Sequence, residues 1–277
     1  EYDKYGQLLS WEGLRYKDVY LIDANSGDSK KILKKKCDQV ILSPFGKYVV
    51  FYERADSAWY AYDIHNDKIT SLTAEIPVNF YDEWNDVPQL PGSYGLMGFT
   101  ENDEYVLIYD FYDVWKVDLS GIQRATNFTN EWGKKNRNRL RYIKLDPDEY
   151  YIDLNQDILL SSVDENTMKE GIMYWEGTGE DPTSLITSDH NYFSFKRAED
   201  SDEIIFRRGN FKEYNDIYLT SMNFSSLRRI SEANPQSSDY LWGDVQLVEW
   251  TSFNNDKLKG MLYTPENLDV NKEYPML

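Results

Sequence analysis

The residues that could perform nucleophilic catalysis are few in this chain, and their spacing matches no catalytic motif. A serine hydrolase needs its nucleophile on a sharp turn, usually within G-x-S-x-G, with a histidine and an acid nearby. That motif does not occur, and the nearest string, Gly92-Ser93-Tyr94-Gly95, lacks its spacing. The two histidines, His65 and His190, each lie in a polar turn, where a solvated side chain is expected. We therefore predict no catalytic residue in this chain.

Metal and cofactor motifs are missing as well. The sequence contains no H-E-x-x-H, no pair of cysteines, no calcium-binding D-x-D-x-D-G loop and no glycine-rich phosphate loop. The acid pair Asp82-Glu83 could in principle serve a glycosidase, but 48 acidic residues make chance neighbours common. The sequence thus predicts neither a metal site nor a cofactor.

Composition narrows the class of protein. The net charge of −18 disfavours a nucleic acid or an anionic membrane as partner, because their phosphates would repel the chain. No segment approaches the roughly 20 apolar residues of a membrane-spanning helix. Aromatic residues make up 16% of the chain, which indicates a packed core rather than disorder. The first residues show neither a signal peptide nor an initiator methionine, and we expect the chain to be trimmed at both ends.

The elements that must position any site are short strands in a repeated unit. A polar turn precedes an apolar strand, a second strand carries aromatics and often ends in an acid, and a third ends before Ser or Thr. Ser43–Lys47 with Tyr48–Tyr52, then Trp59–Asp63 and Ser71–Thr73, form one such unit. The first strands of the later units are Tyr105–Tyr109, Ile158–Ser161 and Ile204–Phe206, the second strands are Val114–Asp118, Ile172–Glu176 and Ile217–Thr220, and Val19–Asp23 is a degenerate leading copy.

The spacing of these units predicts a β-propeller. The second strands end at positions 23, 63, 118, 176 and 220, so the intervals are 40, 55, 58 and 44 residues. These intervals match propeller blades with loop insertions, since four-stranded sheets bury both faces by packing on their neighbours. We predict an all-β fold, a partial β-propeller with about five blades of four-stranded antiparallel sheet. A β-sandwich of many hairpins is the alternative.

Two segments interrupt the repeat. Ile76–Gly98 contains several prolines and glycines and is predicted to be a long ordered loop between blades. Trp132–Arg141 is basic within an acidic protein, which predicts a salt-bridged loop between blades, with contact to an anion or carboxylate as the alternative.

The C-terminal segment has a different pattern. Two strand-like runs, Val245–Thr251 and Leu258–Tyr263, flank the turn-forming sequence Phe253-Asn254-Asn255-Asp256. We predict propeller blades over residues 1–244. Residues 245–277 are then a linker and the first strands of an enzyme domain that continues past the chain.

Several stretches resemble the prolyl oligopeptidase family of serine peptidases, especially its acylaminoacyl-peptidase-like and dipeptidyl-peptidase-like members. The resemblance covers much of the chain and is most specific in the C-terminal segment. The stretches that carry it are Pro91–Gly95, Tyr105–Asp110, Tyr112–Asp118, Phe128–Asn130, Gly133–Asn136, Glu249–Phe253, Leu258–Tyr263, Pro265–Asn267 and Lys272–Pro275.

The resemblance implies a propeller that covers a serine hydrolase domain and admits only short peptides. Some relatives hold the amino terminus of the substrate with paired glutamates, and Asp82, Glu83 and Asp86 could act similarly as substrate-binding residues, although the segment does not clearly match that motif. No catalytic residue of the family maps onto this chain. The usual location of family members suggests a periplasmic or secreted protein, with a cytoplasmic location as the alternative. A homodimer is possible. The alternative function is a non-enzymatic propeller that binds a protein or glycan.

Overall fold

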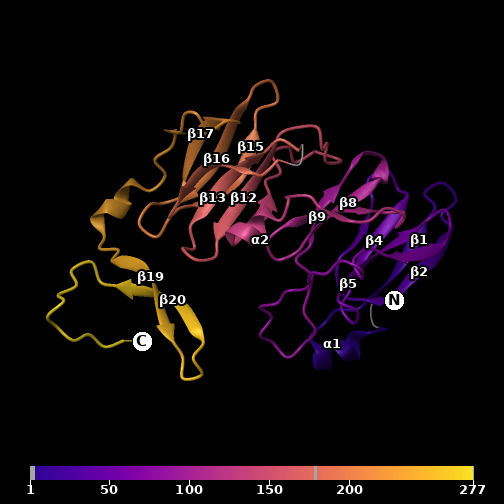
Figure 1. Ribbon diagram of the computed structural model, residues 1–277, viewed down its shortest axis with the longest axis horizontal. Coiled ribbons are helices and arrows are strands. Elements are labelled where there is room, and N and C mark those ends of the chain that lie inside the picture. Colours follow the sequence, from indigo (N-terminus) through magenta and orange to yellow (C-terminus); the bar gives the residue numbers. More distant parts are fainter. Residues whose placement is uncertain (1–3, 178–179, 277) are drawn as a thin grey trace. The chain divides into compact units, whose positions relative to one another are not determined.

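The computed structural model describes residues 4–177 and 180–276, and the chain divides into two compact units. Unit 1 comprises residues 1–131 and 150–155, and unit 2 comprises residues 132–149 and 156–277. Each unit is built from antiparallel sheets whose strands follow one another in sequence order (Figure 1). None of the described helices is long and apolar enough to cross a membrane.

Unit 1 contains a hairpin and two four-stranded sheets. The hairpin pairs β1 with β2, sheet I has the order β3-β4-β5-β6, and sheet II runs from β7 through β8 and β9 to β10. The elements are α1 (Gly6–Glu12), β1 (Lys17–Ile22), β2 (Ser29–Lys36), β3 (Val40–Leu42), β4 (Tyr48–Glu53), β5 (Ala58–Asp63), β6 (Lys68–Ser71), β7 (Leu96–Phe99), the 3₁₀ turn η1 (Glu101–Asp103), β8 (Tyr105–Tyr109), β9 (Val114–Asp118) and β10 (Thr126–Asn127).

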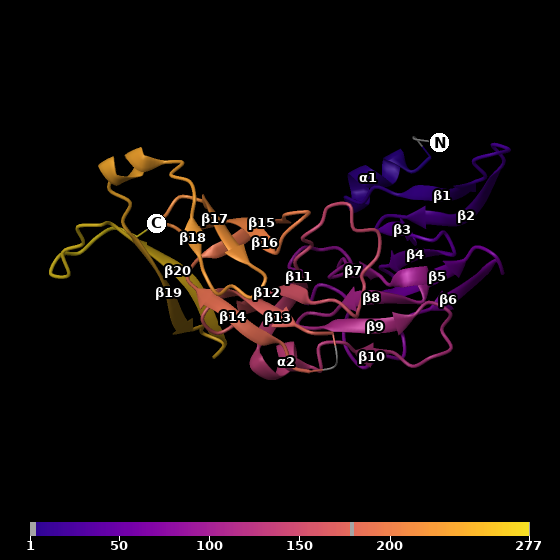
Figure 2. The ribbon, with the colours of Figure 1, turned by 90° about the horizontal axis from the view of Figure 1, so that it is seen from above.

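Both faces of sheet I are buried, which explains why β4 and β5 are apolar on both sides. One face packs on sheet II through a cluster that includes Trp59, Val106 and Trp115. The other face packs on the β1–β2 hairpin, where Leu33 contacts a cluster containing Phe51 (Figure 2). Alternate residues of a strand point to opposite faces, so two buried faces require a continuous run such as Val49–Tyr52.

Unit 2 repeats this arrangement. Sheet III has the order β11-β12-β13-β14, sheet IV has the order β15-β16-β17-β18, and β19 pairs with β20 in a two-stranded sheet. The elements are α2 (Trp132–Asn136), β11 (Asn138–Tyr142), β12 (Ile158–Asp164), β13 (Glu170–Trp175), β14 (Thr183–Ser188), β15 (Asn191–Arg197), β16 (Glu203–Gly209), β17 (Asp216–Ser221), β18 (Arg228–Arg229), the 3₁₀ turn η2 (Pro235–Asp239), β19 (Asp244–Thr251) and β20 (Lys257–Thr264). Sheets III and IV share a cluster that includes Leu159, Ile172 and Phe206.

The sheet order confirms the all-β prediction and the blade-like repeat, with one difference in detail. Sheets I to IV are four-stranded meanders as propeller blades are, whereas the leading copy around Val19–Asp23 forms a two-stranded hairpin. Strand β2 has the sequence Ser-Lys-Lys-Ile-Leu-Lys-Lys-Lys, and most of its residues are exposed. Its lysines make edge pairing with another strand unfavourable, which leaves the hairpin without further strands.

The acids that end the second predicted strands fix the turns that follow. Asp63 Oδ1 accepts hydrogen bonds of 2.9 Å from the backbone N–H groups of His65 and Asn66. Asp118 Oδ1 likewise accepts the Ser120 N–H at 2.9 Å. A short acidic side chain that bonds to the backbone two residues later defines the turn locally. The acid in the repeat therefore has a structural role.

In sheets I, II and IV, the Ser or Thr after the short last strand extends the sheet by one bond. The hydroxyl of Thr73 accepts the Trp59 N–H at 2.9 Å, and that of Thr129 accepts the Val114 N–H at 3.2 Å. In sheet IV, Ser231 Oγ accepts the Ile217 N–H at 2.8 Å. In each case a side chain takes the place of a strand partner for a backbone donor that would otherwise remain unpaired.

The prediction for the basic segment was wrong in its secondary structure. Trp132–Arg141 is not a loop, because it forms α2 and most of β11, the first strand of sheet III. Lys134 and Lys135 lie on α2, whereas Arg139 and Arg141 lie on β11, an outer strand of sheet III, where charged side chains are common. Arg137 does form the expected ion pair, with Glu165 at 2.9 Å.

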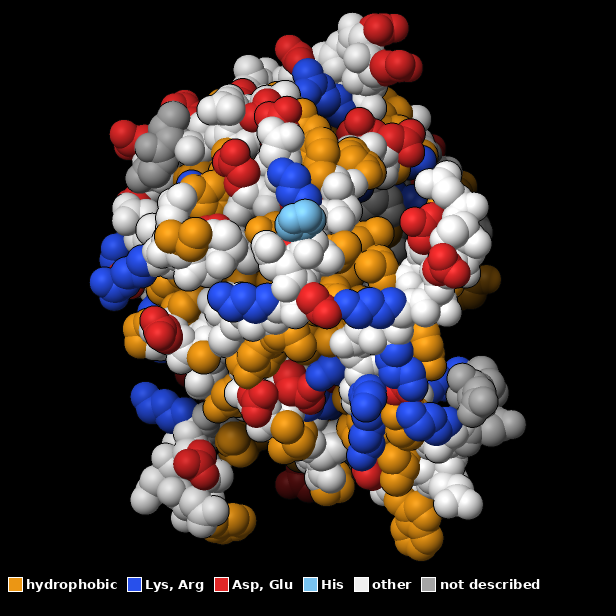
Figure 3. All heavy atoms as spheres, turned by 90° about the vertical axis from the view of Figure 1, so that its right-hand side faces the viewer, with side chains coloured by type: hydrophobic (Ala, Val, Ile, Leu, Met, Phe, Trp, Pro, Cys, Tyr) orange, Lys and Arg blue, Asp and Glu red, His pale blue; other side chains and the backbone are white. Residues whose placement is uncertain are grey.

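Charges of both signs are interspersed on the face of the molecule drawn in Figure 3, where lysine and arginine side chains lie beside acidic ones. On strand β2, three lysines have acidic partners. Lys31 bonds to Asp18 at 2.9 Å, Lys30 bonds to Asp67 at 2.7 Å, and Lys36 pairs with Glu53. The charges of these three lysines are therefore neutralised within unit 1.

Candidate functional site

The predicted substrate-binding acids lie on the loop between sheets I and II, within unit 1. This loop is held by an isolated bridge between Tyr81 and Ser93 and by the Asp82 N–H, which donates to Gly92 O at 2.8 Å. The Glu83 N–H donates to Tyr94 Oη at 2.8 Å. The backbone beneath Asp82 and Glu83 is therefore fixed, as expected for an ordered loop.

Asp82 and Glu83 retain acceptor capacity. Asp82 is half-buried and accepts the Trp84 N–H at 3.0 Å, and Glu83 is exposed and accepts Asn79 Nδ2 at 2.9 Å. Neither carboxylate forms an ion pair with a described residue. Asp86 is exposed farther along the loop, and no hydrogen bond between described residues joins it to the other two.

Aromatic rings gather beside these acids. Trp84, 61% exposed, lies 5.1 Å from Phe111 between ring centroids. Phe111 also contacts Tyr94 at 5.7 Å and Tyr112 at 4.6 Å. Carboxylates next to exposed aromatic faces can bind a cation through both charge and ring quadrupole. The sequence did not predict Phe111 and Tyr112 as neighbours of this loop, because they follow a strand of the next sheet.

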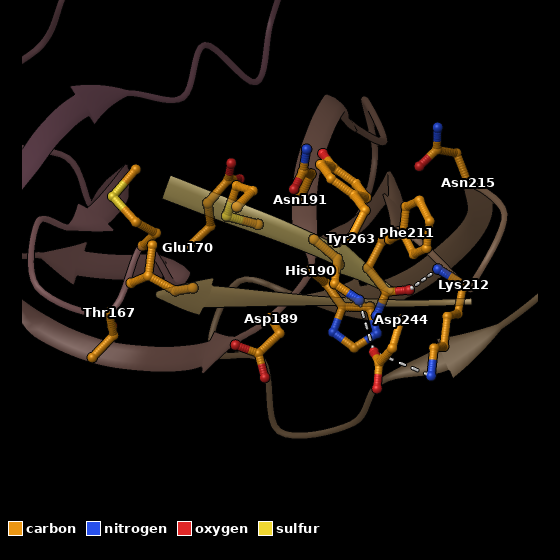
Figure 4. A pocket seen from close by; sticks show the side chains of 16 residues that line it. Thr167, Glu170, Asp189, His190, Asn191, Phe211, Lys212, Asn215, Asp244 and Tyr263 are labelled. Carbon is orange, nitrogen blue, oxygen red and sulfur yellow. Dashed lines mark hydrogen bonds and ion pairs between the residues drawn. The ribbon is translucent and has the colours of Figure 1, made fainter. Parts of the chain in front are cut away.

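Unit 2 contains a cavity of about 650 Å³ that the sequence did not reveal. It lies among the turns that follow β12, β14 and β16, with the β19–β20 hairpin on another side (Figure 4). Its wall includes Glu170, Asp189, Lys212, Phe211 and Tyr263. Gly209 fits the close approach of the turn after β16, because a Cβ at this position would lie 2.2 Å from Asn215 Oδ1.

His190, on the cavity wall, is not the solvated turn residue that was predicted. Only 12% of its side chain is exposed, and Nε2 lies 3.1 Å from Glu213 Oε2. Nδ1 lies 2.8 Å from Ser188 Oγ, and an Arg208 amino group lies within 3.2 Å of both ring nitrogens. His65 is exposed in its turn, as expected.

The contacts of His190 resemble a serine–histidine–acid relay in composition but serve to fix the turn. Ser188 Oγ is also bonded to Tyr192 Oη at 2.6 Å, so the hydroxyl is shared between two partners. Ser188 lies only two residues before His190, whereas a nucleophile must project from a strained turn toward its substrate. We assign this group a structural role.

Glu170 is a carboxylate of the cavity wall whose pKa is raised. Burial raises its pKa, and this effect outweighs the opposing hydrogen bond from the Tyr192 N–H, 3.3 Å long, and the attraction of Arg139. Asp189 forms no hydrogen bond or ion pair with a described residue. Lys212 pairs with Asp244 at 3.3 Å (Figure 4). The wall therefore carries more negative than positive charge.

Comparisons with known proteins give structural neighbours only. No protein-family model matches the chain, and no curated protein matches it. The chain is similar to TolB from Acinetobacter baumannii, with 14% identity, a TM-score of 0.38, and coverage of 94% of this chain and 65% of TolB. It is similar to an oligogalacturonate lyase in complex with manganese, with 10% identity, a TM-score of 0.47, and coverage of 90% of this chain and 66% of the lyase. It is also similar to the acylaminoacyl peptidase of Pyrococcus horikoshii, with 12% identity, a TM-score of 0.46, and coverage of 87% of this chain and 35% of that peptidase.

Proposed function

We propose that this chain is a substrate-selecting propeller of a serine peptidase in the prolyl oligopeptidase family, and that it recognises the free amino terminus of short peptides. The observation that carries this proposal is the fixed pair Asp82 and Glu83 beside the exposed ring of Trp84. A peptide ammonium group is a cation with several donors, which two carboxylates can share.

The C-terminal hairpin supports the same function. Strands β19 and β20 pair over eight residues without a register shift, in the segment whose sequence most resembles the entry into the family's hydrolase domain. Trp250 is 50% exposed on this hairpin, and Phe253 at its tip is fully exposed. Large apolar side chains left open to solvent mark a surface that another domain or protein covers. In this proposal the covering domain is the hydrolase, which supplies the nucleophile, acid and histidine.

The same exposed hairpin also favours a second candidate function, that of a non-enzymatic scaffold that binds another protein. In that case the hairpin would bind a partner chain, and the acids of the loop would have no role in peptide selection. A periplasmic or secreted location is a further part of the proposal and follows from the family resemblance. A homodimer is also part of it, because an open arc of blades would expose apolar faces that favour association.

Peptide binding to the whole chain tests the proposal. We expect trialanine amide to bind, and its N-acetylated form to bind at least about fivefold more weakly, because acetylation removes a charge-assisted contact worth roughly 1 kcal/mol or more. Asp82→Asn and Glu83→Gln should weaken binding of the free amine and leave binding of the acetylated peptide unchanged.

The matched control is Glu75→Gln, which removes an exposed acid at the start of the same loop. It should bind trialanine amide as the parent chain does. Equal affinity for free and acetylated peptide, or equal losses in Glu75→Gln and Glu83→Gln, would contradict the proposed role of the loop.

A further inference from the structure

The cavity of unit 2 combines an apolar wall with unneutralised carboxylates. Its volume of about 650 Å³ falls in the range of small-molecule sites, roughly 300–1,000 Å³. Apolar side chains on the wall remain open to solvent, among them Met168 at 46%, Met261 at 52% and Tyr263 at 63%. A concave surface with this much exposed apolar area has room for the apolar body of a ligand.

The aromatic part of the wall is arranged as a pair. Phe211, from the turn after β16, and Tyr263, from β20, meet edge to face with ring centroids 5.4 Å apart. Two elements far apart in sequence therefore bring ring surfaces to one cavity. Ring faces attract organic cations, and methionine side chains adapt to the shape of an apolar ligand.

The charges of the wall specify the polar end of the ligand. Lys212 already has a partner in Asp244 at 3.3 Å, and both ring nitrogens of His190 contact side chains of unit 2. Glu170 accepts one hydrogen bond, from the Tyr192 N–H, and the charge of Arg139 attracts it. Asp189 has no partner among the described residues. Two carboxylates thus remain available to a cation.

We propose that this cavity binds an organic ammonium ion with an apolar or aromatic body, its charged group beside Glu170 and Asp189 and its body against Phe211, Tyr263 and the two methionines. The site belongs to unit 2 and is independent of the loop that carries Asp82 and Glu83. It therefore goes beyond the proposed peptidase function and stands or falls separately from it.

Methionine methyl NMR of the whole chain locates the binding. The chain has six methionines, of which Met168 and Met261 line the cavity and Met173 is buried in sheet III. Phenethylammonium, titrated to about 10 mM, should shift the methyl signals of Met168 and Met261 and leave that of Met173 in place. The neutral isostere 2-phenylethanol should give smaller shifts at the same concentration.

Variants test the charges. Glu170→Gln and Asp189→Asn should each weaken phenethylammonium binding about three- to tenfold, the loss expected for one charge-assisted contact. Asp200→Asn, which removes an exposed acid in the turn between β15 and β16, should bind unchanged. An unshifted Met173 signal in each variant shows that the fold is intact.

Three results would overturn the proposal. They are the absence of shifts at Met168 and Met261, equal shifts with 2-phenylethanol, and unchanged affinity in both Glu170→Gln and Asp189→Asn with the Met173 signal intact. Loss of peptide selection by the Asp82 and Glu83 variants would leave these shifts unaffected, so the two proposals fail separately.

Discussion

A buried carboxylate, Asp103, ties sheet II to the turn that precedes β4, and its replacement gives a demanding test of the blade packing. Asp103 is 2% exposed and accepts three hydrogen bonds from that turn. Ser43 Oγ donates to Oδ2 at 2.6 Å, Lys47 N–H to Oδ2 at 3.1 Å, and Phe45 N–H to Oδ1 at 3.1 Å. The change considered is Asp103→Asn, which keeps the size of the side chain and removes one acceptor.

The expected cost follows from these contacts. An asparagine side chain has a single carbonyl oxygen and cannot accept from both sides of the turn, so its amide group would face at least one N–H or O–H donor. One lost bond to a charged acceptor costs about 1.5–3 kcal/mol, and a buried donor left unpaired costs about 1–3 kcal/mol. Asp103→Asn should therefore lower the free energy of unfolding by about 3–5 kcal/mol.

Urea unfolding followed by circular dichroism measures this loss, and a double-mutant cycle with Ser43→Ala isolates the contact. We expect a coupling energy of about 1–2 kcal/mol between the two changes, because the side chains bond directly. Asp67→Asn is the control, since its ion pair with Lys30 is exposed and should contribute less than about 1 kcal/mol. A loss of stability for Asp103→Asn no larger than that for Asp67→Asn would show that the buried carboxylate does not hold the turn in place.

Two other polar positions of the repeat give predictions of the same kind. Burial raises the pKa of Asp118, but hydrogen bonds from the Gln123 N–H and from Ser120 outweigh this effect and hold the pKa below its usual range. The ionised carboxylate therefore stabilises the fold above pH ~4, and this stabilisation is lost as the pH falls through the lowered pKa. Asp118→Asn should therefore give a flatter stability profile than the parent below pH ~4 in urea titrations, and parallel profiles would contradict this. Thr129→Val removes the acceptor of the Val114 N–H and the donor to Asp113 Oδ1 at 2.7 Å, and should cost about 1–3 kcal/mol, whereas Thr129→Ser should cost less. An equal loss in both Thr129 variants, measured by thermal unfolding, would assign the effect to packing.

The strands of the repeat could be predicted because their signals are local. Tyr105–Tyr109 and Val114–Asp118 form β8 and β9 with the predicted bounds, since each is a continuous apolar run ended by turn residues. The C-terminal hairpin was also confirmed, with β19 and β20 extending the predicted strands by one residue at one or both ends. Buried runs and turn residues are properties of a few neighbouring residues.

The first strand of each sheet was harder to predict. Val40–Leu42 has only three residues, and Asn138–Tyr142 has a basic sequence that indicates a loop. These strands form because the next strand of the sheet offers a paired edge, and their own residues have little influence. Pairing of this kind depends on tertiary context, which outweighs local propensity.

The cavity and the surroundings of His190 could not have been found from the sequence. Glu213 and Arg208 lie 23 and 18 residues from His190, and only the folding of sheet IV brings them together. The acids Asp82 and Glu83 could be selected because they are adjacent in an acidic, aromatic segment. Their aromatic neighbour Phe111 comes from a different sheet, and no local signal links it to the loop.

We propose that this chain supplies peptide selection to a serine peptidase and that the catalytic serine lies outside these residues. A fluorophosphonate probe tests it most directly, when applied in parallel to this 277-residue chain and to the complete product of its gene. We expect stoichiometric labelling of the complete product at a serine outside these residues, and no labelling of the chain alone. Labelling of any serine within this chain, or a complete product that does not react at all, would contradict it.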